Sequence, residues 1–394
     1  MTDYRKEAQK LESELTANRR TVHGFAETAF DLPQTLAFVE TKLKEMGLTP
    51  KRVGKAGISC LLGKEGGKTI LLRADMDALP MEEKTGLPFA AKNGHCHSCG
   101  HDCHTAMLLG AAKLLKTHEA ELQGQVKLMF QPAEEKLAGA QDMIDHGILE
   151  APHVDAALGM HVLVGPSGYS QCGTFSYKPG CASFSGDAIR ITVTGKDAHG
   201  STPELGVDAI NIAAHIVIAL QEILAREVSC SAKDVVLVGM IQGGTSCNTN
   251  AGSCMLEVSV RSDSREGRAF LKQRVKEISE ATAAAFRGKA SVDYVYGMPS
   301  LYNDEMLCKQ MDAFCREIVG DAHVKVNENL SGTEDFTMVA DRVPAVFLHL
   351  GAGSAEEGHT CGMHNPGMLV DESVLPLGAA VYAHCAVRYL EENR

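Results

Sequence analysis

The spacing of apolar residues changes along the chain. Helical spacing predicts helices within residues 1–46, over 104–118 and over 138–146. Short apolar runs bounded by Gly, Lys or Pro predict strands at 58–62, 69–72, 126–130 and 156–160. Strands that alternate with helices predict an α/β fold, in which functional sites gather where the strands end.

The middle of the chain follows a different order. Its apolar runs predict strands at 188–194, 235–241, 255–260 and 290–296, and long helices at 207–228 and 268–286. The order β-α-β-β-α-β is that of a ferredoxin-like module. Beyond Pro299 the α/β pattern returns. We therefore predict an α/β domain with a central mixed sheet, made of residues 1–184 and 299–394, that is interrupted by an α+β domain at 185–298.

Charge and composition narrow the class of protein. The 394 residues include 38 Lys and Arg against 50 Asp and Glu, a net charge of −12, so we expect no nucleic-acid partner. No apolar run reaches the ~18 residues of a membrane span, and the N-terminal residues are too polar for a secretory signal. With an odd number of cysteines, thirteen, these features predict reduced thiols in a cytoplasmic protein that does not bind membranes.

Four His and three Cys crowd into residues 95–104, which read HCHSCGHDCH. Thiolate and imidazole groups bind Zn, Mn, Co or Ni, and Gly100 would let Cys99 and His101 converge. The spacing is not that of a zinc finger. A structural zinc cluster or a surface thiol patch stays open as an alternative. Because one centre cannot hold seven ligands, three residues are expected bystanders: His95, Cys96 and His97.

Two acidic segments follow predicted strands. Asp75 lies in RADMDALP, where a buried carboxylate could orient a ligand histidine. In QPAEE, one of Glu134 and Glu135 could bind a metal while the other stays free as the general base of metal-assisted hydrolysis. An Asp-rich turn and a solvated acidic turn are the alternatives.

Three single histidines complete the candidate set. His161 closes the strand predicted at 156–160, His364 lies in the turn CGMHNP, and His199 lies in the inserted domain. A lone histidine is usually solvated or satisfied by a neighbour. However, several loops of the α/β domain each offer a metal-type ligand near a strand end, which predicts one shared site.

The motifs RADMDALP, CGHDCHTA, QPAEE, GMHV, GKDAHGS, GTEDF and HNP occur in this order over nearly the whole chain. In this order and spacing the chain resembles the M20 metallopeptidase family, and most closely its amidohydrolase branch, the N-acyl-amino-acid, hippurate and indole-acetyl-amino-acid hydrolases. The resemblance implies a catalytic α/β domain with a two-metal site and an inserted lid domain that forms a homodimer.

The resemblance also implies roles for matching residues. The metal ligands would be Cys99, His101, Glu135, His161 and His364, with Cys99 bridging two ions. The catalytic residues would be Glu134 as general base, Asp75 in support, and His199 of the lid, which would polarise the scissile carbonyl and could reach the partner subunit's site. The substrate carboxylate would meet Asn248 and Arg261.

This chain departs from the branch at several positions. Ser98 and Cys103 replace an Ala and a small residue, and Cys103 could alter metal choice or sensitivity to oxidation. The lid segment SCNTNAGSC differs from the usual Ala-Pro-Asn-Val-Ile-Pro type, which bears on Asn248 and on the substrate. Residues 201–204, STPE, lack the basic or His-containing form often found there.

The predicted function is hydrolysis of the amide bond of a small N-acyl amino acid, with two divalent ions per subunit. Zn or Mn is the first expectation for the metal, and Co or Ni is compatible with the same ligands. Two alternatives are a dipeptidase or aminopeptidase of the same family and a non-catalytic metal- or thiol-binding protein.

Overall fold

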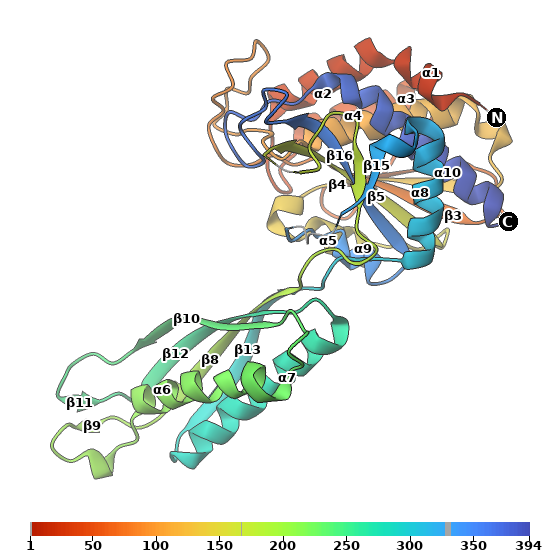
Figure 1. Ribbon diagram of the computed structural model, residues 1–394. Coiled ribbons are helices and arrows are strands. Elements are labelled where there is room, and N and C mark those ends of the chain that lie inside the picture. The colour runs from red at the N-terminus through yellow and green to blue at the C-terminus, as the bar shows by residue number, and fades with distance from the viewer. Residues whose placement is uncertain (1, 167, 328–331) are drawn as a thin grey trace. The chain divides into compact units, whose positions relative to one another are not determined.

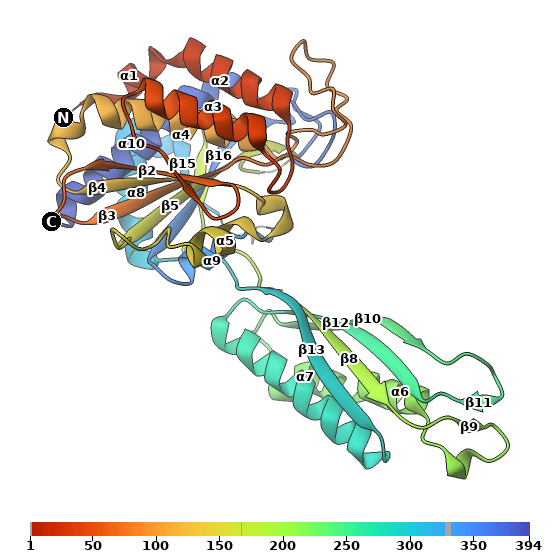
Figure 2. The same cartoon turned by 180° about the vertical axis from the view of Figure 1, so that it is seen from behind.

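The chain folds into two units, which Figures 1 and 2 show from opposite sides. The structure, a computed structural model, describes residues 2–166, 168–327 and 332–394. Unit 1 takes in the residues up to Ala182 and resumes at Tyr302, and unit 2 spans Ser183–Leu301. Each unit has its own apolar core and is described by itself.

Unit 1 is built on an eight-stranded sheet. Its order is β1 (Lys51–Val53), β2 (Gly57–Gly63), β4 (Gln125–Gln131), β3 (Thr69–Asp75), β5 (Ala156–Gly165), β16 (Ala345–Ser354), β6 (Phe175–Tyr177) and β15 (Val324–Val326). Strands β4, β3, β5 and β16 are parallel, whereas β2 and β6 run antiparallel to β4 and β16. The prediction of an α/β fold with a mixed central sheet is confirmed.

Helices cover both faces of this sheet. They are α1 (Tyr4–Gln9), α2 (Glu12–Phe25), α3 (Pro33–Glu45), α4 (His101–Thr117), α5 (Gly139–Asp145), α8 (Glu305–Val319), α9 (Thr337–Ala340) and α10 (Leu375–Glu392). Both views place α1 to α4 and α10 on one side of the strands and α5 and α9 on the other. Every residue of β3 and β4 is buried, as expected for parallel strands covered on both faces.

Strand ends in unit 1 create one polar edge. Strand β3 ends at Asp75, and β5 continues to Gly165, beyond the end predicted at residue 160. Because Arg73 pairs with Gly159, Asp75 and His161 lie at the same level of the sheet. His161 therefore sits where its neighbouring strand stops, which leaves room for other side chains.

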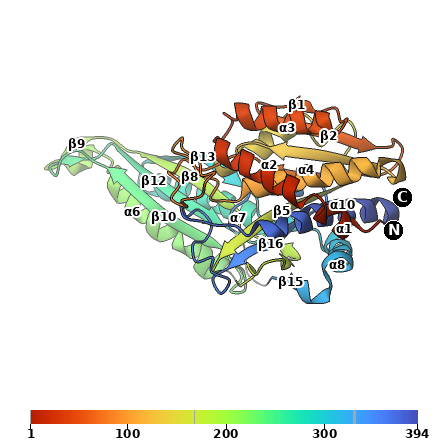
Figure 3. The same ribbon diagram turned by 90° about the horizontal axis from the view of Figure 1, so that it is seen from above.

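Unit 2 combines a four-stranded antiparallel sheet with two helices. The sheet order is β10 (Val235–Gly243), β12 (Ser253–Arg261), β8 (Gly186–Thr194) and β13 (Lys289–Met298). Helices α6 (Ala209–Ala219) and α7 (Arg265–Ala285) pack on the same face of this sheet, as Figure 3 shows. Strands β9 (Ala198–His199) and β11 (Thr249–Asn250) form a separate two-stranded sheet.

One segment of unit 2 has the length and composition of a membrane span. Ala209–Glu227, which covers α6 and the π-helical turn Ile223–Glu227, is long and apolar enough by composition to cross a membrane. Ile212, Ile216 and Leu220 of this segment pack into the core of unit 2. Core helices pass the same test, so the segment is weak evidence for a span.

Candidate metal centre

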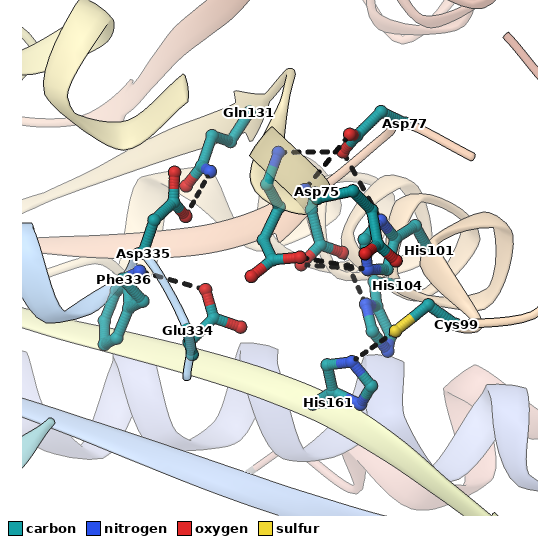
Figure 4. Close-up of polar contacts among 12 residues, drawn as sticks. Asp75, Asp77, Cys99, His101, His104, Gln131, His161, Glu334, Asp335 and Phe336 are labelled. Carbon is teal, nitrogen blue, oxygen red and sulfur yellow. Dashed lines mark hydrogen bonds and ion pairs between the residues drawn. The ribbon is translucent and has the colours of Figure 1, made fainter. Parts of the chain in front are cut away.

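Ligand-type side chains from different segments of unit 1 meet at the polar edge of its sheet (Figure 4). Cys99 precedes Gly100, whose φ of 82° lets the chain turn into α4, which begins at His101. Glu134 and Glu135 open a 3-10 turn directly beyond β4, and His161 comes from β5. Helix α4 and strand β5 therefore carry His101 and His161, whereas Cys99, Glu134 and Glu135 lie in the turns that adjoin α4 and β4.

Cys99 lies at the centre of the predicted ligands. Its Sγ is 3.4 Å from Nε2 of His161 and 3.2 Å from Nε2 of His364. Cys99, His101 and His161 form one group of three, and Cys99, Glu135 and His364 form another, with ligand atoms within 4.8 Å of one another in each group. The structure thus brings all five predicted ligands together, and Cys99 is common to both groups.

Some of the potential ligand atoms in this cluster make no hydrogen bond to another described residue. Both ring nitrogens of His101 and Oε1 of Glu135 are buried without a hydrogen bond among the residues that the structure describes. Leaving such groups unpaired in an interior is costly. Nδ1 of His161 lies 2.6 Å from the carbonyl of Val162, which fixes it as a donor and leaves Nε2 to face Cys99. Thiolate, imidazole and carboxylate donors in this arrangement fit a pair of divalent cations.

Two aspartates approach His101 from either side. Oδ1 of Asp77 is 3.4 Å from Nδ1 of His101, and Oδ2 of Asp75 is 3.7 Å from Nε2. Asp77 also accepts hydrogen bonds from the backbone N–H groups of Glu134 and Glu135, at 3.0 and 3.2 Å. Asp77 therefore connects His101 to the two glutamates, a role that the sequence analysis did not assign to it.

Asp75 lies closer to His104 and Arg73 than to His101. Its Oδ1 is 2.5 Å from Nδ1 of His104, whose Nε2 accepts from the N–H of Val162. Its Oδ2 is 2.6 Å from Nη1 of Arg73. Despite full burial, Arg73 and the neighbouring histidines hold the pKa of Asp75 well below its usual value. Asp75 thus supports the cluster through His104 more directly than through a ligand.

Arg73 is a buried hub between carboxylates. Its guanidinium lies 2.7 Å from Glu334 and 3.1 Å from Asp335, in addition to Asp75. The carboxylates of Glu134, Glu334 and Asp335 are within 4.8 Å of one another. Burial and the nearby charges of Glu334 and Asp335 raise the pKa of Glu134 well above its usual value. A carboxylate with a raised pKa is a stronger base, which suits proton transfer.

A family model described as peptidase family M20/M25/M40 matches residues 71–388, most of the chain. The chain belongs to peptidase family M20.

Individual M20 relatives match along most of their length. An N-acetyl-L-cysteine deacetylase of Bacillus subtilis is 35% identical over 388 residues, which cover 97% of this chain and 90% of the relative. An IAA-amino acid hydrolase of Arabidopsis thaliana is 33% identical over 382 residues, 95% of this chain and 80% of that protein. A solved dinuclear metal-binding M20 peptidase of Bacillus subtilis aligns with a TM-score of 0.81 at 30% identity, over 97% of this chain and 99% of its own.

The three candidate site residues of unit 2 lie at two separate places: His199, Asn248 and Arg261. The pairing of Thr249 with His199 and the hydrogen bond from Gly200 N to the carbonyl of Asn248 bring His199 and Asn248 together. Arg261 ends β12 at the opposite end from Ser253. The eight steps of strand from Ser253 to Arg261 span about 26 Å. Within one chain, Arg261 therefore does not join Asn248 in a single carboxylate clamp.

Five of the seven His and Cys residues in the HCHSCGHDCH window fall outside the two ligand groups that share Cys99, and one of them, His104, contacts Asp75. Nδ1 of His95 contacts the carbonyl of Ala26 at 3.0 Å, and the others are buried, namely Cys96, His97 and Cys103. Burial lowers the pKa of His97 to about 3, so its ring is neutral. The thirteen cysteines, all within the described ranges, are free thiols.

Proposed function

We propose that this M20 hydrolase cleaves the amide bond of N-acyl amino acids and releases a carboxylic acid and a free amino acid. The observation that carries the proposal is that the adjacent residues Glu134 and Glu135 have different surroundings. Glu135 faces His364 at 3.3 Å, within the second ligand group. Glu134 lies outside the two groups that share Cys99, and its buried carboxylate has Oε2 3.9 Å from Nε2 of His101, in a group with His101 and Glu135. A metal store needs no such spare base, whereas hydrolysis does.

The five residues of the two ligand groups would hold two divalent ions, with Cys99 shared between them. Zn or Mn fits the mixed donor set, and Co or Ni is compatible with it. Ions bound there would polarise the substrate carbonyl and lower the pKa of a water toward ~7.

The side chains of this chain would then move the protons. Glu134 accepts a proton from the water as its oxygen attacks the amide carbon, and later gives that proton to the leaving amine. Asp77 and Asp75 hold His101 and His104 in orientation. We assign His199 to the oxyanion that forms on the carbonyl. We assign Asn248 and Arg261 to the substrate carboxylate, supplied by different subunits of the proposed dimer, because the two residues lie apart within one chain.

Unit 2 would serve as a ferredoxin-like lid and as the dimer contact. Its edge strand β10 carries no charged residue, and Leu237 and Ile241 on it are 57% and 52% exposed. The opposite edge strand, β13, carries Lys289 and Asp293, charges of the kind that block strand pairing. We therefore propose that β10 pairs with β10 of a second copy, in a cytoplasmic homodimer.

A substrate panel on metal-depleted protein tests the proposal. One amino acid is offered as its N-acetyl, N-benzoyl and glycyl derivatives, after reconstitution with Zn, Mn, Co or Ni in turn. We expect hydrolysis of the acylated compounds and little of the dipeptide. Preference for the free α-amine of the dipeptide would make the protein a peptidase. Metal uptake without any hydrolysis would favour a binding protein.

A further inference from the structure

A second cluster of charged groups lies behind the metal ligands, and the proposed mechanism does not use it. Helix α2 contributes Arg19 and His23, α4 contributes Asp102, and the loop before Cys99 contributes Glu83. The side chains of these four residues are at most 3% exposed. Burying so many charges is costly unless they compensate one another. The balance of positive and negative charges therefore indicates the protonation state of His23.

His23 lies between two of the carboxylates. Its Nδ1 is 2.8 Å from Oδ2 of Asp102, and its Nε2 is 3.1 Å from both oxygens of Glu83. Nη2 of Arg19 also lies 3.4 Å from Nδ1 of His23. If Nδ1 accepted a hydrogen bond from Arg19, its lone pair would face the carboxylate of Asp102, which is closer, at 2.8 Å. Because ionised carboxylates only accept, both ring nitrogens must donate, and His23 must be an imidazolium.

The charges balance only in this state. Arg19 donates to Asp102 at 2.7 Å and to Glu372 at 3.0 Å, and Arg20 also binds Glu372. Three cations, Arg19, Arg20 and His23, then meet three carboxylates, Asp102, Glu83 and Glu372. Burial alone would lower the pKa of His23, but hydrogen bonds to Asp102 and Glu83 outweigh it and raise the pKa to about 9. The other nearby titratable groups, His97, Cys96 and Cys103, are neutral, because burial lowers the pKa of His97 and raises the pKa of the two thiols.

The two carboxylates bound by His23 belong to the segments that deliver the metal ligands. Asp102 follows His101 directly in α4. Glu83 accepts from the N–H of Ala91 at 2.8 Å and from the hydroxyl of Thr85, and so shapes the loop that leads to Cys99. His23 thus joins the loop that ends in Cys99 to the helix that begins at His101.

We propose that His23 is a positioning residue for the metal centre, whose imidazolium holds the Cys99 loop and the first turn of α4 at the spacing that the two ions require. The inference rests on the metal-ligand assignment proposed above. It predicts a sign for the effect of pH. The stabilisation from a charged His23 is complete below the ordinary histidine pKa of about 6.5, and it is lost as pH rises through about 9.

His23→Gln tests the inference through metal affinity, measured at pH 7 by competition with a chelator. Loss of a residue that orients ligands weakens metal binding by about 10- to 100-fold. The double variant H23Q/E83Q again has equal numbers of cations and carboxylates, so we expect it to bind metal more tightly than H23Q. A role in packing alone predicts no such recovery.

His118→Gln is a matched control. His118 also lies between two carboxylates, Glu7 at 2.9 Å and Glu121 at 3.3 Å. It follows the 17-residue helix α4, which has His101 at its other end, about 25 Å away. Metal affinity should be unchanged in H118Q. Equal loss in H118Q and H23Q, or unchanged affinity in H23Q, would overturn the inference.

A measurement on the metal-free wild-type chain covers the case in which H23Q does not fold. Nuclear magnetic resonance should show both ring nitrogens of His23 protonated at pH 8, and titration of His23 below pH 7 would overturn the inference. Failure of the wild type to bind metal would instead contradict the ligand assignment itself, so the two failures are distinguishable.

Discussion

The two units differ in where they place charge. Unit 1 buries Arg73 with three carboxylates, and it buries the cluster around His23. Among the described residues of unit 2, Asp187 is the single buried charged side chain, and it pairs with Arg268 and Lys272. Most of the exposed large apolar side chains, by contrast, lie in unit 2. Unit 1 therefore buries charged groups, whereas unit 2 exposes apolar ones.

The physical reason is desolvation. Charges that act on a substrate must be held in one geometry, and burial with fixed partners achieves this at a cost in stability. A surface that meets another protein instead gains from exposed apolar residues, which are stabilised on contact.

Glu134→Gln has the largest expected effect. The amide keeps the size of the side chain but cannot accept the proton, so kcat should fall by about 10²- to 10⁴-fold. Metal content, measured by atomic absorption, should stay at two ions per chain. The neighbouring change Glu135→Gln should instead reduce metal content, because Glu135 belongs to the ligand group of Cys99 and His364. Full activity of Glu134→Gln would refute the role of the general base.

Arg73→Met removes the buried hub of unit 1. Arg73 has no exposed side-chain surface, and its loss leaves Asp75, Glu334 and Asp335 uncompensated. Breaking a buried ion pair from one side destabilises a fold by about 3–5 kcal/mol. Thermal and urea unfolding should show this loss. The added change Glu334→Gln should recover part of the lost stability. If Arg73→Met alone were as stable as the wild type, Arg73 would not be needed to compensate the three carboxylates.

The candidate metal centre and the contacts of Arg73 also show what could be predicted from the sequence and what could not. Two of the candidate metal ligands, Glu135 and His161, were predictable because each lies near the end of a predicted strand, and α/β folds bring such ends together. Cys99, His101 and His364 were instead inferred from the motifs that contain them. Asp77 could have been found from its spacing, two residues from Asp75 at the end of a strand. Its contacts with Glu134 and Glu135, however, join residues 57 and 58 positions apart.

Other partners left no local signal. Arg73 binds Glu334 across 261 positions, and His23 binds Asp102 across 79. Such pairs depend on tertiary packing rather than on spacing within one element. The same limit affected Arg261 and Asn248, which are near in sequence but lie at different places in unit 2, because β12 runs away from the β9–β11 sheet.

Leu237→Glu should disrupt the proposed dimer. A charge at an exposed apolar position on β10 would have to be buried against a second copy. An effect of about 2 kcal/mol, typical of a central interface residue, corresponds to a rise of about 30-fold in the dissociation constant. Sedimentation equilibrium measures it. Tyr296→Glu, on the opposite edge strand β13, is the matched control and should leave the dimer intact. Equal effects of both changes would reject β10 as the contact.

Arg190→Met should have the smallest effect and completes the comparison with Arg73. Arg190 lies 2.7 Å from Glu257 across the sheet of unit 2, a distance close to that between Arg73 and Glu334. Its side chain is 46% exposed and that of Glu257 is 40% exposed, so water already solvates both charges. We expect a loss of stability below about 1 kcal/mol, and salt at ~1 M should reduce it further. Urea unfolding at low and high salt measures both effects. If Arg190→Met were as destabilising as Arg73→Met, burial could not be the cause of the difference between the two units, since the two ion pairs have nearly the same length.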